Sequence, residues 1–165
     1  METRSHAERI KIELTERREE LTKLLAALPT EELDWAPAAG MKTYRALLQE
    51  IGAMELVCLN YAKSQEQGDW EAAFASIGQS GNDIGAILRD MEAVRKQTLA
   101  YLDGCTEADM ETPIPLHGPW QHYFGGTHVE PEEIFRWICR HEYYHLGQLV
   151  VYRWQQGFEP AGPMG

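Results

Sequence analysis

Two histidines and a glutamate near the end of the chain have the types and the spacing that metal chemistry requires. They lie in the stretch RHEYYHLGQL, residues 140–149, where His141, Glu142 and His145 form the pattern His-Glu-x-x-His. Residues four apart are neighbours on one side of a helix, so both imidazoles can reach a single ion. Metallopeptidases use this pattern to hold zinc, with the glutamate activating a water molecule. The motif therefore suggests a peptidase, another metal protein, or a helix whose histidines are simply hydrogen-bonded in the core.

The remainder of the chain disfavours the peptidase. Residues 146–165 follow His145 and include no further histidine and no later predicted helix that could provide a third ligand. A sheet that could hold an extended peptide is not evident either. A five-residue pattern is also short enough to occur by chance. The remaining interpretations are a metal site of another kind and two core histidines whose ring nitrogens are hydrogen-bonded within the protein.

The histidines must be positioned by helices, because the apolar residues of the chain recur at three- and four-residue steps. In the last helical segment Ile134, Ile138, His141 and His145 follow these steps, which turns both histidines towards the core. Four segments are predicted to be helical: residues 5–28, 44–64, 83–102 and 130–156. No segment alternates convincingly with the two-residue period of a strand. The predicted fold class is all-α, and four long helices indicate a four-helix bundle.

A weak internal repetition suggests how the helices are connected. The stretches LPTEELDWAP and CTEADMETPI follow the first and third helices and share Thr-Glu, an apolar residue and a proline. This repetition predicts two helical hairpins. Residues 111–129, ETPIPLHGPWQHYFGGTHV, lack a helical period and predict a long ordered loop before the last helix. Its Trp120, His122, Tyr123 and His128 could cap a pocket, or could pack the loop against the end of the bundle.

Composition limits the classes of protein and of partner. The 165 residues are predicted to form a single domain over residues 1–165. With 26 acidic and 15 basic residues the formal charge is −11, so nucleic acids and anionic membrane surfaces are unsuitable partners. No segment has the apolar length of a membrane span or a signal peptide, which predicts a cytoplasmic location. Three widely spaced cysteines, Cys58, Cys105 and Cys139, indicate reduced thiols in place of a disulfide framework.

The last predicted helix resembles that of a known family. HEYYHLGQLVVYRW is similar to the C-terminal helix of the DinB-like (damage-inducible) four-helix-bundle superfamily, in which His-x-x-x-His precedes Gly-Gln, an aromatic residue and an arginine. LPTEELDWAP and GMKTYRALLQEIGAMEL resemble that family's first turn and second helix, so the resemblance covers nearly the whole chain. It implies a bundle, often a homodimer, that holds one divalent metal ion through three histidines. Two of these histidines match His141 and His145.

A glutamate occupies the position of the third family histidine. The family pattern Leu-Leu-x-His-Ile corresponds here to LLQEI, residues 47–51, which places Glu50 at the histidine position. Two histidines and one glutamate form an ordinary ligand set for zinc or iron, and nickel and manganese are further candidates. Helical periodicity leaves an alternative open, because Glu55 lies near the centre of the apolar face and Glu50 lies about 90° from it. Glu55 could be the ligand, or could accept a hydrogen bond from one of the histidines.

Thiol transfer is the activity that the resemblance implies. Relatives include S-transferases that use low-molecular-weight thiols such as bacillithiol or mycothiol on electrophilic small molecules, and coordination to a metal deprotonates a thiol at neutral pH. Arg45, Arg140 and Arg153 could dock the carboxylates of such a thiol, or could be surface charges. One alternative is a metal-dependent hydrolase with Glu142 or Tyr144 as proton carrier. Another is a non-catalytic, stress-associated binding protein whose apolar second helix forms a dimer interface.

Overall fold

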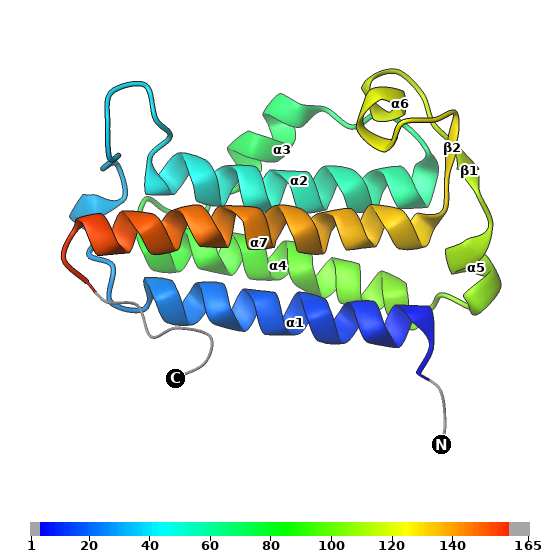
Figure 1. The fold of residues 1–165 in the computed structure, drawn as a ribbon, viewed down its shortest axis with the longest axis horizontal. Coiled ribbons are helices and arrows are strands. Elements are labelled where there is room, and N and C mark those ends of the chain that lie inside the picture. Colours follow the sequence, from blue (N-terminus) through cyan, green and yellow to red (C-terminus); the bar gives the residue numbers. More distant parts are fainter. Residues whose placement is uncertain (1–3, 159–165) are drawn as a thin grey trace.

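Four long helices run side by side along one axis and form the bundle that the sequence predicts (Figure 1). The computed structural model describes residues 4–158. The bundle helices are α1 His6–Leu25, α2 Tyr44–Ser64, α4 Ile84–Asp103 and α7 Pro131–Gln155. The all-α fold class is thus confirmed. None of the helices in the described part of the chain combines the length and the apolar character that a membrane span needs.

Local signals in the sequence set the ends of these helices. The Ser5 hydroxyl accepts a hydrogen bond from the Glu8 amide at 3.1 Å, and the Glu8 carboxylate accepts one from the Ser5 amide at 2.8 Å. This capping box starts α1. α7 has Pro131 in its first turn and ends before Gly157, whose φ of 81° is accessible mainly to glycine. The bundle helices therefore begin and end within a few residues of the predicted ranges.

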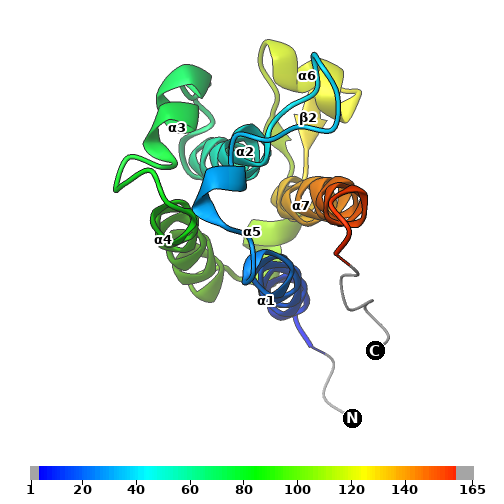
Figure 2. The same cartoon turned by 90° about the vertical axis from the view of Figure 1, so that its left-hand side faces the viewer.

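The order of the helices around the bundle differs from the order that the two predicted hairpins would give. Seen end-on, the order is α1, α7, α2, α4, so α1 lies diagonally opposite α2, and α4 opposite α7 (Figure 2). α1 and α7 run in one direction, and α2 and α4 run in the other (Figure 1). Residues 26–43, 65–83 and 104–130 connect the helices, and links of this length can cross the bundle end or return along its side. The predicted pairing into hairpins was therefore wrong, although the bundle itself is confirmed.

Short elements occupy the connections. They are the 3₁₀ turn η1 Thr30–Glu32, the helices α3 Trp70–Ser76, α5 Glu107–Glu111 and α6 Pro119–Phe124, and the antiparallel strands β1 Ile114–Pro115 and β2 His128–Val129. The segment 111–129, predicted to be a long ordered loop, is ordered but contains a helix and a strand pair. Tyr61 of α2 anchors it, because its hydroxyl donates to the Pro115 carbonyl at 2.9 Å and accepts from the His117 amide at 3.0 Å. Elements this short have no period to detect and depend on such tertiary contacts.

A layer of buried charge divides the apolar core. Arg18 of α1, Glu55 of α2, Arg95 of α4 and Glu142 of α7 supply one side chain from each bundle helix, and each residue is at most 6% exposed. Arg95 donates to Glu55 at 2.7 and 3.0 Å and to Glu142 at 2.5 Å. Arg18 donates to the same two carboxylates at 3.0 and 2.8 Å. Two positive and two negative charges neutralise one another, and the two apolar clusters lie mainly on either side of this layer.

α2 is apolar around most of its circumference because it is covered within the chain. It packs against α3, α4 and α7. Gly52 permits one of these close approaches, since a Cβ at this position would lie 2.8 Å from the side chain of Ile77, which follows α3. The apolar composition of α2 is thus explained without a second subunit, so it no longer supports a dimer interface on this helix.

Candidate metal centre

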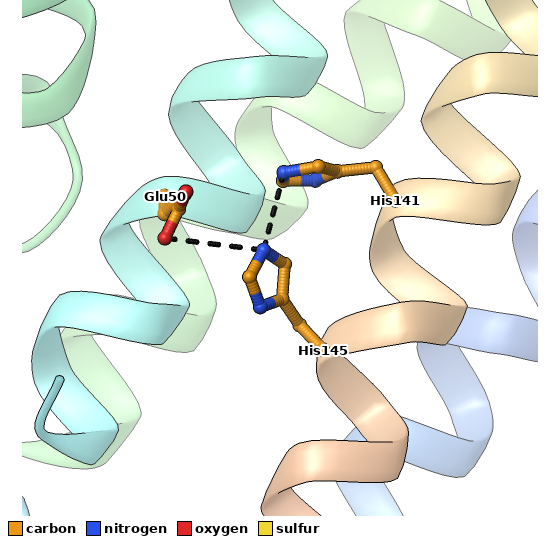
Figure 3. A group of neighbouring side chains, drawn as sticks. All are labelled: Glu50, His141 and His145. Carbon is orange, nitrogen blue, oxygen red and sulfur yellow. Dashed lines mark hydrogen bonds and ion pairs between the residues drawn. The ribbon is translucent and has the colours of Figure 1, made fainter. Parts of the chain in front are cut away.

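Glu50, His141 and His145 meet between two neighbouring helices of the bundle (Figure 3). Glu50 extends from the first half of α2, and the histidines extend from successive turns of α7. α2 and α7 pack against each other, so the four-residue spacing on α7 brings both imidazoles opposite the α2 carboxylate. The structure therefore brings together all three residues that the sequence named as ligands.

The ring nitrogens of the two histidines face each other. The Nε2 atoms of His141 and His145 are 3.2 Å apart, and Oε2 of Glu50 lies 3.9 Å from Nε2 of His145. Two nitrogens that bind one zinc ion tetrahedrally at ~2.0–2.1 Å are ~3.3–3.4 Å apart. The imidazoles therefore have nearly the spacing of two ligands of one ion. The carboxylate is slightly more distant and would have to turn towards them.

Gln148 orients His145. Its side-chain oxygen lies 2.7 Å from Nδ1 of His145, and its side-chain nitrogen donates to the Tyr144 hydroxyl at 3.2 Å. A proton on Nδ1 that is donated to Gln148 leaves the lone pair of Nε2 directed at the cluster, which is the tautomer that binds metal. Gln148 follows His145 by three residues and so lies on the same face of α7, but only the structure identifies this contact.

Burial keeps His141 uncharged. Burial lowers the pKa of His141 to about 4, and the neighbouring His145 contributes to the same effect. An imidazole binds a metal ion only through an unprotonated nitrogen. At neutral pH His141 is therefore already in the neutral form that ligation needs.

Lys42 shares the carboxylate of Glu50. Its ammonium group forms an ion pair with Oε2, which is the oxygen that faces His145. The Lys42 side chain is mostly exposed, whereas Glu50 is largely covered, so this pair lies at the rim of the cluster. An ion bound between the histidines would compete with the ammonium group for the same oxygen.

The other acidic candidates lie in the charged layer of the core. Glu55 and Glu142 both accept hydrogen bonds from Arg18 and Arg95, so their oxygens are occupied. Glu55 faces the centre of the bundle, as its periodicity indicates, but there it contacts arginines in place of histidines. Tyr144 is largely exposed at the edge of the cluster, with its ring 5.1 Å from that of His145.

The three arginines considered as docking groups are each paired with an acidic residue. The pairs are Arg45 with Asp34 at 2.8 Å, Arg140 with Glu133 at 2.5 Å and Arg153 with Glu32 at 3.6 Å. In the segment before α7, Trp120 is buried and Tyr123 is exposed, and both line a cavity that reaches Glu50. His122 and His128 are exposed and do not line it.

A second group of possible ligands lies where α1 begins. His6, Glu107 and Glu111 are close enough to hold an ion, but both glutamates are exposed. His6 also lies 2.5 Å from Glu132 of α7, so contacts between the ends of α1, α5 and α7 account for this cluster. The group between α2 and α7 is the more enclosed of the two.

The fold and the cluster together define a class of protein, namely four-helix bundles with potential metal ligands between facing helices. The sequence model of the DinB superfamily matches residues 13–149, a range that contains Glu50, His141 and His145. The chain therefore belongs to the DinB superfamily, which confirms the resemblance.

A solved structure is similar to this chain. The crystal structure of a DinB-like protein from Bacillus subtilis matches with a TM-score of 0.67 and 19% identity over 91% of this chain and 93% of that one. At this identity the similarity shows the fold alone. No curated protein matches the chain.

Proposed function

We propose that the chain binds one divalent metal ion through Glu50, His141 and His145 and uses it for thiol transfer. The observation that carries the proposal is the 3.2 Å separation of the two Nε2 atoms beside a carboxylate oxygen at 3.9 Å. Without an ion, two imidazole rings at this separation form a hydrogen bond with each other. The adjacent carboxylate, on a different helix, favours a ligand set, because it adds a third donor of the kind that zinc and iron accept.

The residues of the cluster suit this chemistry. A divalent ion held there would keep coordination positions free and supply a Lewis acid that lowers the pKa of a bound thiol. Gln148 holds His145 in the ligating tautomer, and Glu50 reduces the net positive charge. In the transfer, the thiol proton passes to solvent, the sulfur forms a bond to an electrophilic carbon, and the leaving group departs with its bonding electrons.

The thiol would have to come from outside the chain. Cys58 and Cys139 are buried, and burial raises the pKa of both thiols, that of Cys139 to about 12. Burial also raises the pKa of Cys105. Such thiols stay protonated at neutral pH and are weak nucleophiles. The proposal therefore includes a low-molecular-weight thiol, of the bacillithiol or mycothiol type, as co-substrate.

Thiol transfer fits the surroundings of the cluster better than hydrolysis does. A hydrolase needs a proton carrier next to the activated water. Of the two candidates, Glu142 is held by Arg18 and Arg95, and Tyr144 is largely exposed. A metal-bound thiol can lose its proton to solvent, and transfer to an electrophile with a stable anionic leaving group needs no proton donor, so we place transfer ahead of hydrolysis.

Elemental analysis of protein purified without a tag or chelator tests the metal site. We expect about one zinc, nickel, manganese or iron ion per chain, lost in His145→Ala and reduced in Glu50→Ala. His122→Ala, which removes an exposed histidine far from the cluster in sequence, is the matched control and should keep the metal. Wild-type protein that stays metal-free after incubation with all four ions would contradict the site.

Activity assays separate the possible functions. The metal-loaded protein is incubated with an electrophile such as monobromobimane, with and without the thiol, and products are measured by mass spectrometry. A transferase shows turnover only with thiol present, beyond the rate without protein. Turnover with water alone would indicate a hydrolase, and no turnover in either case a binding protein. His145→Ala should abolish any turnover that depends on the site.

A further inference from the structure

A cavity of about 300 Å³ opens beside the metal cluster. It lies between α2, α6, α7 and the start of α3, and Glu50 lines it. The same glutamate belongs to the ligand group, so one end of the cavity adjoins the candidate metal centre. A larger hollow of about 530 Å³ lies between α1 and α4, but neither histidine nor Glu50 lines it. The smaller cavity is therefore the one that a molecule bound at the metal would enter.

The walls of this cavity are mainly aromatic. Trp70, Trp120, Tyr123 and Trp137 contribute four rings from three different helices. Trp120 is held in place by Tyr61, with their ring centroids 4.8 Å apart, and forms a fixed wall. Trp70 and Tyr123 are 38% and 55% exposed, which leaves large apolar rings facing solvent at the mouth. Large rings left exposed around a hollow mark a binding surface for an apolar molecule.

The charged groups around the cavity limit the kind of molecule that it can bind. Glu50 is the one ionisable carboxylate on the cavity wall, and no lysine or arginine within residues 4–158 lines it. A negatively charged molecule would therefore find no cationic side chain on the wall, and only the metal ion, where the thiol binds, could attract it. A positively charged molecule could stack on the rings, but the metal ion beside Glu50 would repel it. An uncharged molecule meets neither obstacle.

We infer that the cavity binds the electrophilic substrate, and that this substrate is an uncharged aromatic or similarly apolar molecule of one or two rings. The size follows from the volume, which is at the lower end of the range for small-molecule sites. This inference rests on the proposed metal-dependent function, since the metal cluster gives the cavity its reactive end. The thiol would approach from the rim near Lys42, whose ammonium group is released when Glu50 turns to the ion.

Three naphthalene probes of equal size and different charge test the inference by isothermal titration of zinc-loaded protein. They are 2-naphthalenemethanol, 2-naphthoate and 2-naphthylmethylammonium. We expect the neutral alcohol to bind at least about tenfold more tightly than the ammonium ion, and we expect a simple thiol that competes for the zinc to displace any bound carboxylate. Trp70→Ala and Tyr123→Ala should each weaken binding of the alcohol about 2- to 10-fold, as loss of one ring contact predicts. Trp154→Ala removes a tryptophan that is 60% exposed on α7 and does not line the cavity, so it should change nothing.

Two binding patterns would overturn the inference, as would the absence of any probe binding to zinc-loaded protein. One pattern is equal or tighter binding of the ammonium probe, or of the carboxylate in the presence of the thiol. The other is neutral binding that Trp70→Ala and Tyr123→Ala leave intact while circular dichroism shows both variants folded. Zinc content is measured on each sample, which separates this inference from the proposed function. Bound zinc without probe binding refutes the aromatic substrate alone. Ring-dependent probe binding in a chain that holds no metal refutes the metal-dependent function and leaves an apolar ligand site.

Discussion

At the scale of single residues, the cluster depends on two neighbours that are not ligands themselves. Gln148 fixes the ring of His145 through a contact of 2.7 Å, and Lys42 engages the oxygen of Glu50 that faces this ring. The contact with Gln148 orients the ligand His145, whereas the ion pair with Lys42 competes with the metal ion for Glu50. The affinity for metal should therefore respond to both residues, in opposite directions.

Replacement of Gln148 should weaken metal binding. Gln148→Leu removes the acceptor for Nδ1 of His145 and should lower zinc affinity about 10- to 100-fold, the usual effect of losing a partner of a ligating histidine. Gln148→Glu keeps an acceptor and should bind zinc at least as tightly as the wild type. Competition with a chromophoric chelator measures both affinities. Equal affinities for the two variants would show that this contact does not orient the ring.

Replacement of Lys42 should strengthen metal binding. Lys42→Met frees the Glu50 carboxylate from an exposed ion pair, and pairs of this kind correspond to a change of about 1.5- to 5-fold in affinity. The gain should shrink at high salt because exposed charges are screened. Lys63→Met, which removes an exposed lysine from the last turn of α2, controls for the change in net charge. Weaker zinc binding by Lys42→Met would contradict competition for Glu50.

At the scale of the elements, the charged layer holds the four bundle helices in register. Each helix contributes one charge, and every charge contacts partners on other helices. Such a layer pairs only when the four helices have the right relative positions, so we expect it to specify the arrangement of the bundle more than to add stability. Removing a single member leaves a buried charge without its partner, which is costly.

Arg95→Met should destabilise the fold. The substitution leaves Glu55 and Glu142 facing each other with Arg18 alone, and loss of one partner of a buried pair costs about 3–5 kcal/mol. Urea unfolding followed by circular dichroism measures the difference. Arg89→Met, which changes an exposed arginine on the same helix, should stay within about 0.5 kcal/mol of the wild type. A similar small change for Arg95→Met would mean that the layer is not tightly formed.

The same layer should make the protein sensitive to acid. Burial by itself would raise the pKa of Glu55, but Arg95 and Arg18 outweigh it and hold the pKa below the ordinary 4.5. A carboxylate with a lowered folded pKa stabilises the fold above its unfolded pKa, and this contribution is lost as the pH falls below that value. The free energy of unfolding should therefore drop below about pH 4.5. Glu55→Gln should be less stable at pH 7 and should show a shallower drop, as urea titrations at pH 7 and 3.5 would reveal.

At the scale of the whole molecule, the candidate metal centre joins two helices that are distant in sequence. α2 supplies Glu50 and α7 supplies both histidines, so an ion bound there would link the second and the last helix of the bundle. Anything that binds the folded chain and not the unfolded one stabilises the fold. Metal binding should therefore raise the melting temperature, in addition to appearing in the elemental analysis.

Zinc should raise the melting temperature of the wild-type protein. At a free zinc concentration of 100 times Kd the stabilisation is about 2.7 kcal/mol, or about 5–10 °C for a chain of this size. His145→Ala should lose this shift. His6→Ala, which disrupts the exposed group near α5, should keep it. The opposite pattern, measured by calorimetry, would assign the bound zinc to the His6 group.

Much of this protein is determined by local patterns in its sequence. Apolar residues at three- and four-residue steps define the four bundle helices, because each helix must bury one stripe. The four-residue spacing of His141 and His145 places their rings together on any helix. The motif position of Glu50 pointed to the residue that joins them, whereas the face of α2 alone pointed to Glu55.

Only the tertiary structure decided the features that depend on which helices face each other. Helical periodicity cannot distinguish neighbouring helices from diagonal ones, so the predicted hairpins were wrong. It placed Glu55 and His145 on core-facing stripes but could not show that Glu55 would meet Arg18 and Arg95. The contacts of Lys42 and Gln148, and the ring-lined cavity, likewise arise where separate segments meet. The physical reason is that an apolar stripe shows only that one side of a helix is covered. The residues that cover it lie elsewhere in the chain.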